Sequence, residues 1–96
     1  MITHRRYLRK RDSEKIKKLI RKKGLTYPAI AELLGKSPAT IKNVVNGFTY
    51  SYGVAEGIEK LLGKEGLFPY LREKRKREEL RRKALEEAKK NLAREV

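Results

Sequence analysis

The sequence predicts an all-α protein: a compact four-helix domain with a basic N-terminal arm before it and a long charged helix after it. Three observations lead to this prediction. Apolar residues recur at three- and four-residue spacing through much of the first 70 positions, as they do on one face of a helix. Glycine or proline separates these stretches, whereas residues 70–96 contain neither. The predicted divisions are residues 1–12 for the arm, 13–69 for the domain and 70–96 for the last helix.

The formal net charge is +14, and it is unevenly distributed. Residues 1–23 carry +9, residues 24–68 carry zero and residues 69–96 carry +5. A neutral centre between basic ends is typical of a protein that binds a polyanion. Because no run approaches membrane-spanning length and no segment has the apolar face of an interfacial helix, we expect a cytoplasmic chain without a membrane partner.

The residue types that support catalysis or metal binding are sparse. There is no Cys and only one His, at position 4, so a disulfide or a thiolate metal site is excluded. We find no nucleophile–base pair, carboxylate cluster or glycine-rich phosphate loop. We therefore expect a protein that is not an enzyme and has no cofactor, metal or small-molecule ligand. The 40% of charged residues also resembles the composition of thermophile proteins.

The arm is rich in arginine, and two interpretations of it stay open. Arg5, Arg6 and Arg9 surround Tyr7 and Leu8. These residues form either a solvated tail or an arm that follows the minor groove of DNA. Alternatively, Tyr7 and Leu8 dock on the core of the domain.

The first helix is expected over residues 13–23, with Asp12 or Ser13 as its N-cap. Ile16, Leu19 and Ile20 recur at helical spacing and should face the core. Gly24 then ends the helix.

Residues 26–46 predict two short helices joined by a three-residue turn. Thr26 caps the first helix, which ends at Leu34, and the second runs from Pro38 to about Val45. In the turn, Gly35 suits a left-handed helix end, and Ser37 suits an N-cap. Proline is favoured at the first position of a helix. Small Ala31 allows the two helices to cross closely, and the core should contain Ile30, Leu34, Ile41 and Val44.

This pattern resembles the lambda-repressor/Cro-like group of helix-turn-helix regulators. The resemblance covers residues 13–70. The wider context, with an aromatic-Pro step at Phe68-Pro69, is also similar to phage Ner-like regulators. Two positions depart from the family pattern. Lys36 stands where the turn is usually apolar, and Tyr27 replaces an amide residue that often opens the first helix. The resemblance implies a lambda-repressor-like fold.

The resemblance also implies a function and a set of contacts. It implies a small transcriptional regulator or repressor of phage type that binds double-stranded DNA, with its second motif helix in the major groove. Lys42 would read a guanine edge and Asn43 an adenine edge. Thr40 and Tyr27 would contact phosphates. The residues that face DNA in the family correspond here to Ser37, Pro38, Ala39, Lys42, Asn43 and Asn46.

The loop after the second motif helix is expected to approach the DNA backbone. Phe48 should pack on the core, and Tyr50, Ser51 and Tyr52 offer hydroxyl groups to phosphates. The alternative is that one tyrosine is a core residue and the other is exposed. A further helix follows over residues 53–62, and Gly57 within it indicates close helix packing.

Residues 70–96 predict one long helix, with favourable i,i+4 pairs at Glu73–Arg77, Glu78–Arg82, Glu79–Lys83 and Glu86–Lys90. Three interpretations stay open. The helix is solvated, it forms a homodimer through the narrow stripe of Leu85, Ala88, Leu92 and Val96, or its basic run from Arg72 to Lys83 contacts phosphates.

Other functions fit the same composition. A protein that coats DNA without sequence preference, an RNA-binding protein, and an antitoxin-like interaction protein acting through its last helix are the alternatives to sequence-specific DNA binding.

Overall fold

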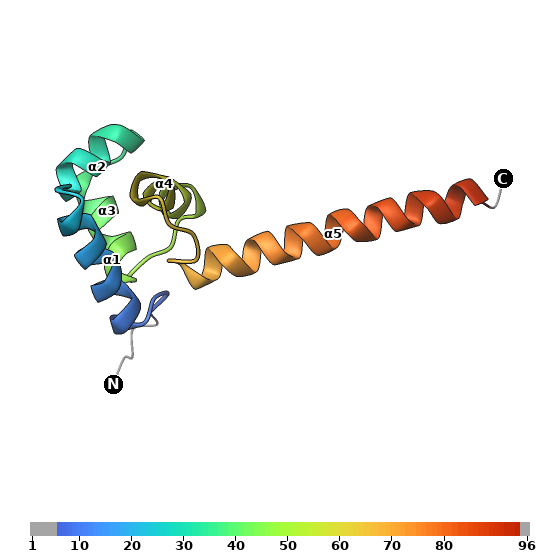
Figure 1. The fold of residues 1–96 in the computed structure, drawn as a ribbon, viewed down its shortest axis with the longest axis horizontal. Helices are drawn as coiled ribbons and strands as arrows, with labels where there is room; N and C mark the ends of the chain where they lie inside the picture. Colours follow the sequence, from blue (N-terminus) through green and yellow to red (C-terminus); the bar gives the residue numbers. More distant parts are fainter. Residues whose placement is uncertain (1–5, 95–96) are drawn as a thin grey trace.

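The computed structural model describes residues 6–94, and this part of the chain is helical without strands. The helices are α1 (Lys10–Lys22), α2 (Tyr27–Leu34), α3 (Pro38–Asn46), α4 (Tyr52–Leu62) and α5 (Pro69–Arg94). Helices α1–α4 form a small body from which α5 projects, so that the molecule measures 58 × 37 × 21 Å (Figure 1). The all-α class is confirmed. The lambda-repressor-like arrangement of four helices and the three divisions of the chain stay predictions.

Helix α1 begins earlier than the sequence indicated. The predicted start at Ser13 is wrong, because α1 begins at Lys10 with Arg9 as its N-cap residue. Ser13 is buried, and its backbone N–H already donates to the Arg9 carbonyl. Leu8 is only 2% exposed, so the chain enters the core before the helix starts.

The two motif helices and their turn follow the prediction closely. The Thr26 hydroxyl accepts a hydrogen bond from the backbone N–H of Ala29 at 3.3 Å. Gly35 ends α2 with φ +66°, a conformation that is costly for a residue with a Cβ. The Ser37 hydroxyl accepts from the N–H of Thr40 at 3.2 Å and so caps α3. Helix α3 ends at Asn46, one residue later than predicted.

All five helices contribute to one apolar core. Ile16, Ile30, Ile41, Ile58 and Phe68 have no exposed surface, and Leu71 of α5 is 2% exposed. The close packing predicted at Gly57 lies between α4 and α2, because a Cβ on Gly57 would be 2.6 Å from Cδ2 of Leu34. This contact fixes α4 against the first helix of the motif.

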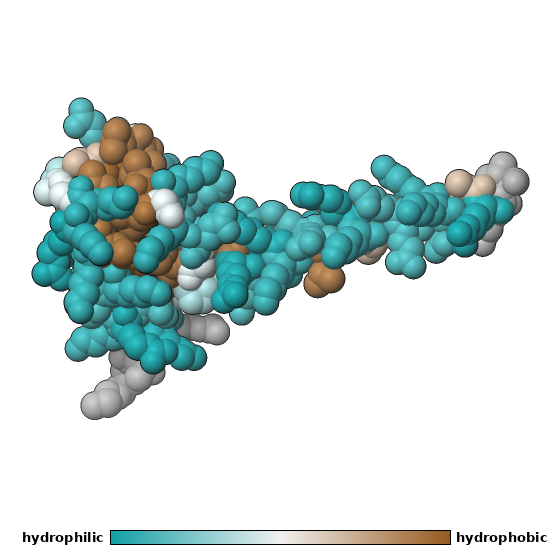
Figure 2. All heavy atoms as spheres, in the orientation of Figure 1, coloured by the Kyte–Doolittle hydropathy of each residue, from teal (hydrophilic) through white to brown (hydrophobic). Residues whose placement is uncertain are grey.

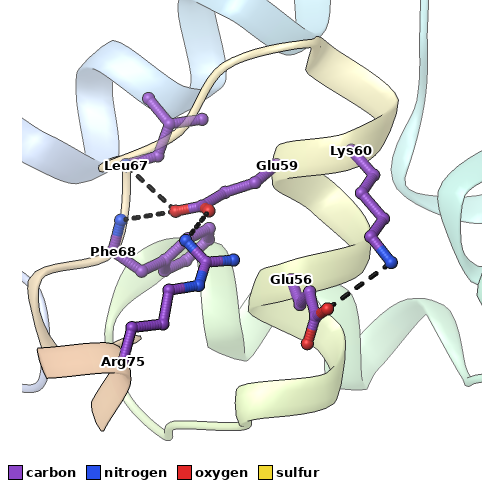
Figure 3. Close-up of polar contacts among 6 residues, drawn as sticks. All are labelled: Glu56, Glu59, Lys60, Leu67, Phe68 and Arg75. Carbon is purple, nitrogen blue, oxygen red and sulfur yellow. Dashed lines mark hydrogen bonds and ion pairs between the residues drawn. The ribbon is translucent and has the colours of Figure 1, made fainter. Parts of the chain in front are cut away.

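The buried carboxylate of Glu59 connects α4 to the start of α5. Its Oε2 accepts hydrogen bonds from the backbone N–H groups of Leu67 at 3.1 Å and Phe68 at 3.4 Å. Its Oε1 accepts one from Nη1 of Arg75 at 3.0 Å (Figure 3). Glu59 is 3% exposed, and no local sequence pattern predicts its burial. With buried Leu71, these bonds set the direction in which α5 leaves the body.

Beyond Lys74 every described residue of α5 is exposed, and hydrophilic residues dominate the face seen in Figure 2. Of the four predicted ion pairs, Glu79–Lys83 is present at 3.5 Å. Lys74–Glu78 forms in the opposite order at 3.6 Å. Leu85 and Leu92 of the apolar stripe are exposed, while Val96 lies outside the described residues.

Candidate nucleic-acid interface

Helix α3 has one buried and one exposed face. Ile41, Val44 and Val45 are completely buried, which anchors the helix on α1, α2 and α4. The exposed face comprises Pro38, Ala39, Lys42 and Asn43. A short helix with both ends capped and three apolar anchors presents these four side chains in a fixed register.

Ser37 and Thr40 form the capped start of α3. Their hydroxyl oxygens are 2.8 Å apart, in addition to the bond between the Ser37 hydroxyl and the Thr40 backbone. Since each hydroxyl has one proton and only one proton is needed between them, the pair retains one donor for an external acceptor. Both residues therefore stabilise the helix end, whatever else they contact.

Asn46 is more constrained than the sequence indicated. Its side-chain Nδ2 donates to the Lys42 carbonyl at 2.9 Å within α3. Its own carbonyl accepts from Nη2 of Arg6 at 2.7 Å. Asn46 is half-buried. Among the bonds within residues 6–94, its side-chain amide uses one of its two N–H donors.

Residues 6–9, which we call the N-terminal strap, dock on the end of α3. Besides the Arg6 bond, the backbone N–H of Tyr7 donates to the Gly47 carbonyl at 2.8 Å. Leu8 is a core residue and Arg9 is exposed. The docking alternative is therefore confirmed for Leu8, whereas Arg6, Tyr7 and Arg9 are exposed. Arg5 lies outside the described residues.

Gly47 is where the strap and α3 meet. Its φ is +80°, and a Cβ there would lie 2.8 Å from the Leu8 Cβ and 2.9 Å from the Leu8 nitrogen. No side chain fits this position without displacing the strap. Arg6 donates to the carbonyl of Asn46 at the C-terminus of α3. Its positive charge is favourable there because the C-terminus is the negative end of the helix dipole.

The prediction that Phe48 packs on the core is wrong. Phe48 is 60% exposed, and the Arg6 guanidinium lies 5.6 Å from its ring centroid. The physical reason is that Leu8 of the strap fills the apolar space beside Gly47. Leu8, which is 40 positions earlier in the chain, therefore takes the place in the core that was predicted for Phe48.

The loop after α3 belongs to a cluster of aromatic rings. Tyr50 contacts Tyr7 of the strap at 4.9 Å between ring centroids, Tyr52 at 5.6 Å and Tyr70 of α5 at 6.0 Å. Tyr50 is 49% exposed, whereas Tyr52 is half-buried against the core. Burial raises the pKa of Tyr70 to about 12. The cluster joins the strap, the loop and the last helix.

Ser51 has a structural role in this loop. Its hydroxyl accepts from the backbone N–H of Val54 at 3.2 Å and caps α4, which begins at Tyr52 rather than Gly53. The hydroxyl proton is not used by this bond.

Tyr27 lies at the start of α2, beside a pocket of about 300 Å³ between α1 and α2. Burial raises the pKa of its hydroxyl. A tyrosine hydroxyl is protonated at neutral pH even without this shift, so it can donate a hydrogen bond. The pocket is lined by Lys17, Ile20, Arg21, Leu25, Thr26 and Tyr27. Two of these residues are cationic, and Lys17 pairs with Glu14 at 3.6 Å.

A family model described as a helix-turn-helix domain matches residues 4–46. The match ends where α3 ends, and within the described residues it spans the strap, α1, α2 and α3. It supports a helix-turn-helix DNA-binding protein, which is broader than the lambda-repressor/Cro-like or Ner-like resemblance. Comparisons with curated proteins and with solved structures gave no match.

Among residues 6–94, no helix is long and apolar enough to cross a membrane. No group of three or more His, Cys, Asp or Glu side chains there is arranged to hold a metal ion.

Proposed function

We propose that this protein is a sequence-specific binder of duplex DNA, a small transcriptional regulator of phage or mobile-element type. The observation that carries the proposal is the exposed face of α3, within a domain that matches a helix-turn-helix family. Helix α3 enters the major groove with its N-terminus first, as recognition helices of this class do.

Each exposed residue of α3 has a chemical role in this proposal. The Lys42 ammonium donates to O6 and N7 of a guanine, and the Asn43 amide bonds N6 and N7 of an adenine. Pro38 and Ala39 offer apolar contact to a thymine methyl group. Phosphate contacts come from the remaining donors, namely Tyr27, Ser37, Thr40, Asn46, Tyr50, Ser51 and Tyr52.

Non-specific attraction comes from the basic ends. Arg9 of the strap and several basic residues of α1 are exposed. In this proposal they neutralise phosphates and release counterions, which makes affinity strongly dependent on salt. Arg6, bonded to the end of α3, holds the strap there, and Arg5 adds a further positive charge to the arm.

Binding selection from a random duplex library at moderate salt tests the proposal. A recovered motif supports the proposal. An inverted repeat with half-sites about one helical turn apart would also indicate that the protein binds as a homodimer. Salt-sensitive binding without any enriched motif would instead favour an architectural or RNA-binding protein.

The double variant Lys42→Ala/Asn43→Ala tests whether these two residues recognise bases. Each bidentate base contact discriminates by about 1–3 kcal/mol, so affinity for the selected site should fall at least tenfold. Affinity for a scrambled duplex should change little, because the phosphate contacts remain. Titrations of both duplexes by fluorescence anisotropy measure this. A variant that still prefers the selected site as strongly as the wild type would refute the assignment of α3.

A further inference from the structure

One face of α5 continues the surface of the loop that follows α3. At the base of the helix, the Tyr70 ring lies 6.0 Å from both Tyr50 and Tyr52. Nζ of Lys74 lies 4.6 Å from the Tyr52 ring centroid. Residues three and four apart share a helix face, so Arg77 and Arg81 follow Tyr70 and Lys74 along it. The face that touches the loop therefore carries two arginines beyond the body.

These arginines are free to bind an external anion. Both are exposed, and within residues 6–94 neither has a carboxylate within 4.0 Å. In the described part of the chain, Lys74 forms an ion pair only with exposed Glu78, at 3.6 Å. Arg75, in contrast, lies on the other flank of α5 and is held by buried Glu59. The two flanks of the helix thus have different roles.

The composition of this part of α5 indicates that its exposed face binds a polyanion and not a protein. Residues 72–83 contain eight basic and three acidic residues, and Leu80 is the only apolar one. Protein interfaces need an apolar centre, and one leucine does not provide it. Charge complementarity and continuity with the Tyr50 loop both indicate the DNA backbone.

We propose that Lys74, Arg77 and Arg81 form a second contact to the phosphates of duplex DNA, beside the major-groove site and on the side of the Tyr50 loop. This inference rests on the proposed function. At 1.5 Å per residue, Lys74 to Arg81 spans about 10 Å, which corresponds to about three nucleotides of one strand. The contact extends the footprint in one direction from α3.

The test compares two double variants that remove the same charge. Arg77→Gln/Arg81→Gln changes the proposed face. Arg72→Gln/Lys76→Gln changes two exposed residues on the opposite side of α5, which also lack an ion pair within residues 6–94. Glutamine is a good helix former, and circular dichroism checks that α5 is retained.

Loss of two phosphate contacts should reduce the salt slope of log K by about 1.8. Between 50 and 200 mM salt, the wild type should therefore lose about twelvefold more affinity than Arg77→Gln/Arg81→Gln. Hydroxyl-radical protection should shorten on one side by about three nucleotides. The control pair should retain the wild-type protection and most of the slope. Equal slopes for the two double variants, or unchanged protection in Arg77→Gln/Arg81→Gln, would overturn the inference.

Measurements on a selected and a scrambled duplex separate this inference from the proposed function. If the wild type binds both duplexes equally, sequence-specific recognition fails, yet the salt slopes on either duplex still compare the two faces of α5. If the wild type prefers the selected site but the double variants behave alike, only the second contact fails.

Discussion

Two glycines in left-handed conformation illustrate how a residue is constrained by its own backbone or by a distant neighbour. Gly35 and Gly47 end the two motif helices with φ of +66° and +80°. A Cβ on Gly35 would meet nothing within 4 Å, whereas one on Gly47 would meet Leu8 at 2.8 Å. A side chain at Gly35 would therefore cause backbone strain only. A side chain at Gly47 would cause backbone strain and also a clash with Leu8.

We expect Gly47→Ala to destabilise the protein by about 2–4 kcal/mol, from backbone strain and the clash with Leu8 together. The matched control, Gly35→Ala, should lose only about 1–2 kcal/mol from backbone strain. Urea unfolding measures both. If the two variants lose the same free energy of unfolding, the strap does not press on Gly47.

At the scale of the element, two glutamates one turn apart on α4 should contribute differently to stability. Glu56 and Lys60 form an exposed ion pair at 3.4 Å, and Glu59 is buried with three hydrogen bonds (Figure 3). Exposed pairs contribute little, since water competes with them. A buried carboxylate that accepts backbone N–H groups leaves those donors unsatisfied when it is removed.

The substitution Glu59→Ala should therefore cost about 2–4 kcal/mol, and Glu56→Ala less than about 0.5 kcal/mol. Because the Arg75 side chain is 41% exposed, water partly replaces its lost partner. The loss for Glu59→Ala should therefore be smaller than the loss for breaking a fully buried ion pair. Chemical denaturation provides the comparison. Similar losses for the two alanine variants would contradict the role of Glu59 at the α4–α5 junction.

At the scale of the whole molecule, the net charge of +14 acts on stability and on DNA binding in opposite directions. Like charges repel in the folded state, and salt screens that repulsion. Salt also weakens every phosphate contact through counterion release.

Raising salt from 50 to 200 mM should therefore increase the melting temperature of the free protein. If six or more phosphates are contacted, the same change should weaken duplex binding by about a thousandfold. Differential scanning fluorimetry and anisotropy titrations in matched buffers measure the two effects. A melting temperature that falls with salt would mean that attractive ion pairs, rather than net repulsion, dominate the fold.

The sequence by itself determined the helices and the turn of the motif. The N-caps at Thr26 and Ser37, the C-cap at Gly35 and the uninterrupted last helix all depend on residues within about four positions of one another. The exposed face of α3 followed from the same local periodicity. Such features can be predicted because neighbours in the chain are also neighbours in space.

Only the tertiary structure decided how these elements are joined. The Arg6–Asn46 bond spans 40 positions and the Glu59–Arg75 bond spans 16, and no local pattern specifies either of them. Leu8 rather than Phe48 entered the core for the same reason, because both are apolar and only the space between packed helices selects one. The strap, the aromatic cluster and the direction of α5 are thus consequences of packing, which depends on the whole chain at once.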